Sequence, residues 1–77
     1  MPHGLKNIPL RIFRQYLESK GIKIIRKNGG HEIWGGKCLK RPIILQSHID
    51  PVPEFVVKNS LNALNVDKED FFSFFDA

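Results

Sequence analysis

The sequence is poor in cysteine and has no long apolar segment. Cys38 is the only cysteine, which excludes an intramolecular disulfide and a cysteine-rich zinc site and fits a reducing compartment. No apolar run exceeds Ile43-Ile44-Leu45 in length, far short of a membrane-spanning helix or a signal-peptide core. We therefore expect a cytoplasmic protein with no membrane partner. The 77 residues suffice for one small core, so we assign residues 1–77 to a single domain.

Acidic side chains are scarce in the first half of the chain. Residues 1–41 carry ten basic and two acidic side chains, whereas residues 42–77 carry two basic and six acidic ones. The two halves therefore differ in sign, although the whole chain has a net charge of +4. A basic half favours a polyanion or an acidic protein as partner, because the summed potential attracts such ligands. An unevenly charged surface without any ligand explains the same pattern.

The start of the chain predicts an amphipathic helix. Pro9 can occupy a first helical position, which needs no N–H, and Gly21 supplies a left-handed stop. Between them, apolar residues recur at spacings of three and four and form the expected buried stripe: Leu10, Phe13, Tyr16 and Leu17. Three charged residues are expected on the opposite face: Arg11, Arg14 and Glu18.

Three extended segments follow, separated by turn signals. Residues 22–27 are β-branched and roughly alternating, Asn28-Gly29-Gly30 favours a tight turn, and residues 31–34 resume the extended pattern. Residues 42–46 predict a third strand, in which proline is tolerable at the first position. Residues 47–53 contain two prolines and an aspartate and predict a loop.

Two more helices are expected after this loop. Pro53 can open the first, and Asp67 can cap a short C-terminal one with Asp70 in its first turn. The buried stripe of the first would be Val57, Leu61 and Leu64. The result is an α+β fold with both main helices on one face of a three-stranded antiparallel sheet. The other face stays open, which suits a ligand.

A histidine follows two glycines at the start of the second predicted strand. Gly29 and Gly30 would let a ribose phosphate approach the imidazole of His31 closely. Imidazole can take a proton near neutral pH from a ribose 2′-hydroxyl that attacks the adjacent phosphate, with no metal required. A partly exposed histidine without a catalytic role is the alternative.

Basic residues and a second histidine flank this position. Cations in the neighbouring turns are expected to bind the phosphate: Lys27, Lys37, Lys40 and Arg41. His48 would lie at the same edge of the sheet as His31 if the strands pair in chain order. It would then be either the acid partner of His31 or a loop histidine that hydrogen-bonds the turn.

Other site chemistries find no support in the sequence. The separations among His3, His31 and His48 match no recognised metal spacing. The chain also has no Walker-type loop, nucleophile elbow or paired-carboxylate arrangement. We therefore expect no metal and no cofactor.

The aromatic residues allow more than one interpretation. Tyr16 is expected in the core, and Trp34 suits either the core or a base-stacking surface. Residues 71, 74 and 75 of the Phe-rich tail share a helix face, from which Phe72 diverges. The tail therefore either covers the domain's own core or forms an exposed patch for a partner.

Three runs in the first half of the chain form a pattern shared with a known family. They are Ile8-Pro9, Leu17-Glu18-Ser19-Lys20-Gly21-Ile22 and Arg26-Lys27-Asn28-Gly29-Gly30-His31. A first helix ending in a Gly-hydrophobic pair, a basic strand and a Gly-Ser-His step are typical of the HicA (YcfA-like) toxin family, which this chain resembles. Gly30 stands where the family has serine.

The resemblance extends over residues 8–66. Gln46-Ser47-His48 matches the family's Pro-x-His after the third strand, with the histidine kept and the proline lost. The second helix matches more loosely. Residues 67–77 form an acidic, Phe-rich extension beyond the family core.

The resemblance implies an activity as well as a fold. The fold would be α-β-β-β-α, like that of a double-stranded-RNA-binding domain, which agrees with the order of elements predicted above. The activity would be that of an mRNA interferase, an endoribonuclease toxin of a type II toxin–antitoxin pair that a HicB-type antitoxin inhibits. His31 would be its catalytic residue.

Two rival functions follow from the same residues. One is a non-catalytic RNA-binding module that recognises the shape of an A-form RNA helix through contacts to the RNA backbone. The other is a decayed toxin, which acts only through its complex with an antitoxin. The sequence does not determine the oligomeric state of the free protein.

Overall fold

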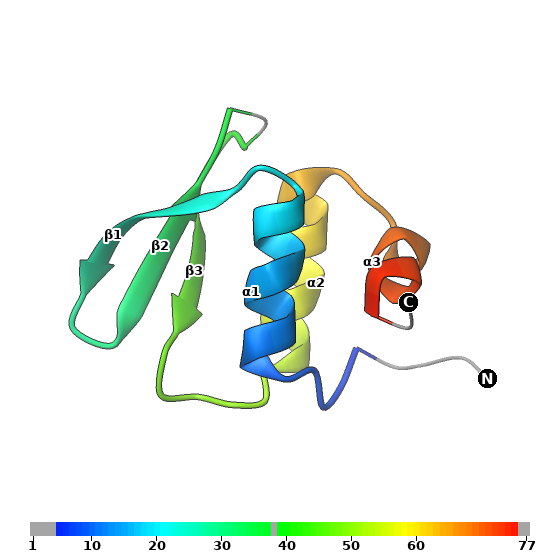
Figure 1. Cartoon of the computed structure of the whole chain (residues 1–77), viewed down its shortest axis with the longest axis horizontal. Coiled ribbons are helices and arrows are strands. Elements are labelled where there is room, and N and C mark those ends of the chain that lie inside the picture. Colours follow the sequence, from blue (N-terminus) through cyan, green and yellow to red (C-terminus); the bar gives the residue numbers. More distant parts are fainter. Residues whose placement is uncertain (1–4, 38, 76–77) are drawn as a thin grey trace.

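The computed structural model describes residues 5–37 and 39–75, which form three helices and one three-stranded antiparallel sheet (Figure 1). In chain order the elements are α1 (Leu10–Ser19), β1 (Lys23–Asn28), β2 (His31–Gly35), β3 (Ile43–Gln46), α2 (Glu54–Leu64) and α3 (Lys68–Phe75). The predicted α+β fold and its order of elements are confirmed. His3 and Cys38 lie outside the described residues. None of the helices in this described part has the length and apolarity needed to cross a bilayer.

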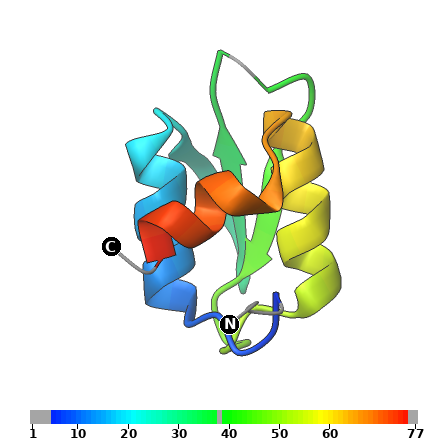
Figure 2. The ribbon, with the colours of Figure 1, turned by 90° about the vertical axis from the view of Figure 1, so that its right-hand side faces the viewer.

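The two longer helices cover the same face of the sheet. α1 and α2 lie side by side against it, and α3 crosses them on the side that faces away from the sheet (Figures 1 and 2). The core fills the space between, where Phe13, Leu17 and Val57 are buried against Trp34 and Leu45. Within the described residues, no helix covers the other face of the sheet.

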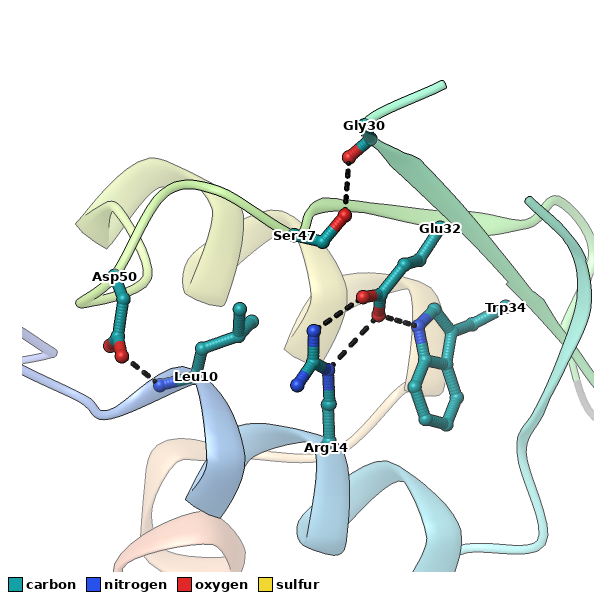
Figure 3. A network of polar contacts seen from close by, with 7 residues as sticks. All are labelled: Leu10, Arg14, Gly30, Glu32, Trp34, Ser47 and Asp50. Atoms are coloured by element: carbon teal, nitrogen blue, oxygen red, sulfur yellow. Dashed lines mark hydrogen bonds and ion pairs between the residues drawn. The ribbon is translucent and has the colours of Figure 1, made fainter. Parts of the chain in front are cut away.

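The start of α1 depends on a distant side chain. Pro9 precedes the helix with its fixed φ, but it offers no side-chain cap. The backbone N–H of Leu10 donates instead to Oδ1 of Asp50, at 2.9 Å (Figure 3). After the last turn, Gly21 adopts a φ of 80°, which stops the helix as predicted. The buried stripe is the expected one: Leu10, Phe13, Tyr16 and Leu17.

The strand register assigns the side chains of the sheet to two faces. The face under the helices is formed by residues that pair across β2 and β3: Glu32, Trp34, Ile43 and Leu45. Successive side chains of a strand alternate, so the intervening residues project from the open face: His31, Ile33, Ile44 and Gln46.

An ion pair between the partly exposed Arg14 and the buried Glu32 connects α1 to the sheet. The Glu32 carboxylate, 1% exposed, accepts hydrogen bonds from Nε of Arg14 at 3.1 Å, from Nη2 of Arg14, and from Nε1 of Trp34 at 3.2 Å (Figure 3). Burial alone would raise the pKa of Glu32, but the hydrogen bonds from Arg14 and Trp34 outweigh it and lower that pKa. Arg14, which was expected on the face opposite the buried stripe, is only partly exposed and directs its guanidinium to the buried carboxylate. Trp34 belongs to the core.

α3 covers the core on the far side of α1. Asp67 caps this helix by accepting the N–H of Asp70 at 3.0 Å, as predicted. Phe71 is fully buried, and its ring centroid lies 4.9 Å from that of Tyr16. The other three phenylalanines pack partly buried against the core: Phe72, Phe74 and Phe75. Of the two interpretations of this tail, the structure supports the one in which it covers the domain's own core.

A polar cluster holds α3 against the last turn of α1. The Tyr16 hydroxyl donates to Oδ2 of Asp70 at 2.6 Å, and Nζ of Lys20 lies 2.6 Å from the same oxygen. Burial, and then the Asp70 carboxylate, raise the pKa of Tyr16 well above its ordinary value. Lys20, and then Tyr16, lower the pKa of Asp70.

Candidate functional site

His31 is the first residue of β2, at the end of the sheet next to the β1–β2 turn. Its neighbours across the sheet are Asn28 on β1 and Gln46 on β3. The side chain is exposed on the open face. A ligand can therefore reach this imidazole directly from solvent.

His48 lies at the same edge of the sheet as His31. The strands pair in chain order, which was the condition for this placement. The ring of His48 packs against Gly30: a β-carbon on Gly30 would lie 2.7 Å from Nδ1 and 2.9 Å from Cε1. Such contacts are too short to persist, so any larger residue at this position would displace the ring. Gly30 thus has His31 as its chain neighbour and His48 as its packing neighbour.

The loop that carries His48 is held by hydrogen bonds on both sides of this residue. At its start, the N–H and the hydroxyl of Ser47 both donate to the carbonyl oxygen of Gly30, at 2.8 and 2.9 Å (Figure 3). Midway along the loop, the Asp50 carboxylate accepts the first N–H of α1. These bonds restrict the backbone on either side of His48.

The two turn glycines have different structural roles. Gly29 has a φ of 62°, which residues with a β-carbon rarely adopt, and the space beside it is open. The space beside Gly30 is filled by His48. His48 thus takes up the space that the lack of a side chain leaves at Gly30, whereas the space beside Gly29 stays open. The close approach of a substrate to His31 past these glycines stays a prediction.

The four cations expected around His31 do not all gather there. Lys27 lies close to the β1–β2 turn. Lys37, Lys40 and Arg41 belong to the β2–β3 loop, at the opposite end of the sheet (Figure 1). Because a strand rises about 3.3 Å per residue, β2 ends about 13 Å from His31, and the loop lies beyond that point. β2 therefore leads the chain away from the His31 imidazole, and phosphate binding by these three cations stays a prediction.

A different cation, which the sequence reading missed, shares the face of His31. A bulge at Ile25 shifts the alternation of β1, so that Arg26 pairs with Ile33 and projects from the open face. Arg26 and His31 are then diagonal neighbours, about 7 to 8 Å apart and within reach of a long side chain. The adjacent apolar pair Ile24-Ile25 is the sequence signal for this bulge, because strict alternation would place Arg26 under the helices.

The described residues therefore bring two imidazoles and one guanidinium to the end of the sheet next to the β1–β2 turn. Imidazoles can exchange protons near neutral pH, and a guanidinium can bind phosphate. Within residues 5–37 and 39–75, no group of three or more His, Cys, Asp or Glu residues could hold a metal ion. No family model, curated protein or solved structure matches this chain. The resemblance to the HicA family stays a prediction from its sequence motifs.

Proposed function

We propose that this protein is an endoribonuclease that cleaves mRNA by proton transfer through histidine, as the toxin of a type II toxin–antitoxin pair. The observation that carries the proposal is the placement of His31 and His48 around Gly30 at the end of the sheet next to the β1–β2 turn. Arg26 on the same face adds a partner for phosphate. The sequence motifs of the HicA family favour the same activity.

The reaction uses one histidine as base and the other as acid. His31 takes the proton of a ribose 2′-hydroxyl while the 2′-oxygen attacks the adjacent phosphorus. The new O2′–P bond replaces the P–O5′ bond, and the leaving 5′-oxygen takes a proton from His48. The products are a 2′,3′-cyclic phosphate and a 5′-hydroxyl.

Cations along the sheet bind the RNA backbone. Arg26 shares the open face with His31 and is close enough to stabilise the negative charge that develops on the reacting phosphate. Lys27 pairs with Glu32 and projects from the other face, so it would bind a neighbouring phosphate rather than the reacting one. Phosphates further along the RNA strand are contacted by three cations of the β2–β3 loop: Lys37, Lys40 and Arg41. Binding weakens as salt rises, because these contacts release counterions from the nucleic acid.

A HicB-type antitoxin would inhibit this activity by covering the edge that holds His31. The open face of the sheet and the β1 edge are basic, so an antitoxin with an acidic surface would be complementary to them. Such a partner excludes RNA from the two imidazoles without any change in the toxin's fold.

One observation favours a second candidate, an RNA-binding module without cleavage. Three of the four predicted phosphate-binding cations lie a strand length away from His31. Cations spread along a sheet suit the tracking of a nucleic-acid backbone as well as they suit catalysis.

Expression in a bacterial host separates the two functions. We expect growth arrest and cleavage of a reporter mRNA with the wild-type chain, and neither with His31→Ala. His31 is exposed, so this variant should fold, and circular dichroism of the purified protein checks that it does. Two folded proteins that both leave the mRNA intact but bind it would favour the RNA-binding module, and equal toxicity would place the active group elsewhere.

The purified protein tests the chemistry directly. Wild-type protein in the presence of a chelator should convert a labelled RNA to fragments that end in a 2′,3′-cyclic phosphate. His48→Ala should form the same products more slowly. Cleavage that stops on chelation would contradict a mechanism carried by histidine alone.

A further inference from the structure

The two edge strands of the sheet, β1 and β3, differ in how well they are protected against pairing with a strand of another molecule. β1 has a bulge and carries Lys23, Arg26 and Lys27, features that keep another strand from adding to an edge. β3 has a regular register and no charged residue. Its Ile44 side chain is 52% exposed. β3 is therefore the edge open to a further strand.

The backbone groups of β3 alternate between β2 and the free edge. The N–H of Ser47 donates to Gly30 on the β2 side, at 2.8 Å. In an antiparallel pair every second residue points its N–H and C=O groups to the same neighbour, and the pairing of β3 with β2 has no irregularity. Ile44 and Gln46 therefore direct their backbone groups away from β2.

The free edge presents as many donors as acceptors. Among the residues described, the N–H and C=O of Ile44 and the N–H of Gln46 have no partner within the protein. The Gln46 carbonyl is already engaged, because it accepts the N–H of Ile49 at 3.2 Å. Pro42 has no N–H, and the planarity of its peptide group directs its carbonyl outward. Two donors and two acceptors remain.

We propose that this edge binds the β3 strand of a second copy of the chain, antiparallel to it, about a two-fold axis at Ile44. In that register Ile44 exchanges two hydrogen bonds with its counterpart, and each Gln46 N–H donates to the Pro42 carbonyl of the other copy. The position where Pro42 has no N–H falls opposite the Gln46 carbonyl that Ile49 already engages. Every outward backbone group is then satisfied.

The surface beside β3 suits the same occupant. Two grooves between β3 and the start of α2 share Ile44, Phe55 and Val56, and Phe55 is 66% exposed. Among the described residues, neither groove is lined by a charged side chain. Two chains with a net charge of +4 can therefore meet here without direct repulsion. Their basic β1 strands would form the two outer edges of a six-stranded sheet.

This dimer keeps the candidate site accessible. Both His31 side chains would project from the same open face, about 20 Å apart by the spacings of strands and residues in a sheet. The inference does not depend on the ribonuclease proposal, since it rests on the backbone and charge pattern of β3.

The oligomeric state of the full chain tests the proposal. In analytical ultracentrifugation, the wild-type protein should shift from monomer to dimer as its concentration rises. Ile44→Lys should weaken dimerisation about tenfold or more, because two like charges then meet at the two-fold axis. Ile25→Lys is the matched control: it places the same change on another exposed isoleucine, which is 65% exposed and lies within β1, at the opposite edge of the sheet. This variant should dimerise like the wild type.

Amide hydrogen exchange locates the interface. In the wild-type chain, the amide protons of Ile44 and Gln46 should exchange slowly at high protein concentration and rapidly on dilution. Circular dichroism checks that both variants, Ile44→Lys and Ile25→Lys, are folded. A wild-type chain that stays monomeric, with rapid exchange at Ile44, would overturn the proposal and leave the edge to a strand of a different protein. A dimer that resists Ile44→Lys, or that Ile25→Lys also disrupts, would overturn it as well.

Discussion

The imidazole of His48 occupies the space into which a β-carbon of Gly30 would project. The closest approach, 2.7 Å to Nδ1, makes the position of the ring dependent on the absence of a side chain at residue 30. The resemblance to HicA toxins places a serine at this position. In this chain the hydroxyl that reaches Gly30 comes from Ser47, which donates to its carbonyl oxygen.

Gly30→Ala should slow RNA cleavage about as much as His48→Ala, by roughly a hundredfold, because the added methyl group displaces the imidazole. The double variant should be no slower than either single variant. Stability should change by less than about 0.5 kcal/mol, since the exposed ring can move aside. Single-turnover kinetics and denaturant melts measure both quantities. Losses that add up in the double variant would show that the two residues act independently.

Arg26 and Lys37 form a matched pair for the assignment of phosphate contacts. Arg26→Gln should lower the cleavage rate of bound RNA by roughly tenfold or more, because Arg26 shares the open face with His31. Lys37→Gln should mainly weaken binding, because Lys37 lies at the other end of the sheet. Each variant should reduce the salt dependence of RNA binding by about one ion. Equal effects on the cleavage rate would contradict the placement.

Arg14→Ala should lower the free energy of unfolding by about 2 to 3 kcal/mol, because it leaves the buried Glu32 carboxylate without its cation. Glu32→Gln should lower the free energy of unfolding less, by about 1 kcal/mol. The Arg14 side chain is 35% exposed, so water can solvate its charge once the carboxylate is gone. Urea titrations at neutral pH compare the two variants. A larger loss for Glu32→Gln would reverse the roles given to the two partners.

The same ion pair makes stability depend on pH on the acid side. The pKa of Glu32 is lower in the folded protein than its ordinary value of 4.5. The contribution of the ionised Glu32 carboxylate to the free energy of unfolding is therefore complete above pH 4.5. It is lost as the pH falls through the pKa that Glu32 has in the folded protein. Urea titrations at decreasing pH should show this loss in the wild type, and a smaller one in Glu32→Gln. Identical acid profiles would refute the assignment.

Tyr16 is the only tyrosine, so its ionisation can be followed by ultraviolet absorbance of the whole protein. Because burial and Asp70 raise its pKa, tyrosinate should appear only well above pH 10.0, the ordinary value. The neutral Tyr16 hydroxyl stabilises the folded protein fully below pH 10.0, and this stabilisation is lost as the pH rises through the pKa of Tyr16 in the folded protein. Asp70→Asn should lower the titration midpoint without restoring the ordinary value, since burial remains. A normal midpoint in the wild type would contradict the buried position of Tyr16.

Phe71→Ala should destabilise the fold by about 3 to 5 kcal/mol, because it empties a fully buried position between α3 and α1. Phe75→Ala should cost less, since Phe75 is only partly buried. Thermal and denaturant unfolding measure the difference. If both variants unfold like the wild type, α3 does not belong to the cooperative core.

The order of helices and strands was predictable because its signals act over a few residues. Pro9 and Pro53 precede helices because proline has a fixed φ, and Gly21 and Gly29 adopt positive φ where a helix stops and a hairpin turns. The spacing of apolar residues then indicates which helix face is buried. None of these signals requires knowledge of which distant segments meet.

The candidate site was predictable only in part. His31 follows the turn glycines directly, so its place at the sheet edge follows from the hairpin. The bulge at Ile25, which brings Arg26 to the same face, depends on how β1 pairs with β2. The packing of His48 on Gly30 joins residues 18 positions apart, and no local pattern reports such a contact.

The sequence by itself determined the succession of elements, the apolar stripes and the hairpin that presents His31. Only the tertiary structure decided which charges are buried and which groups share a face. It brought Arg14 to Glu32 and moved the cations of the β2–β3 loop away from His31. The physical reason is range: backbone preferences act between near neighbours, whereas burial, ion pairing and close packing depend on segments that folding brings together.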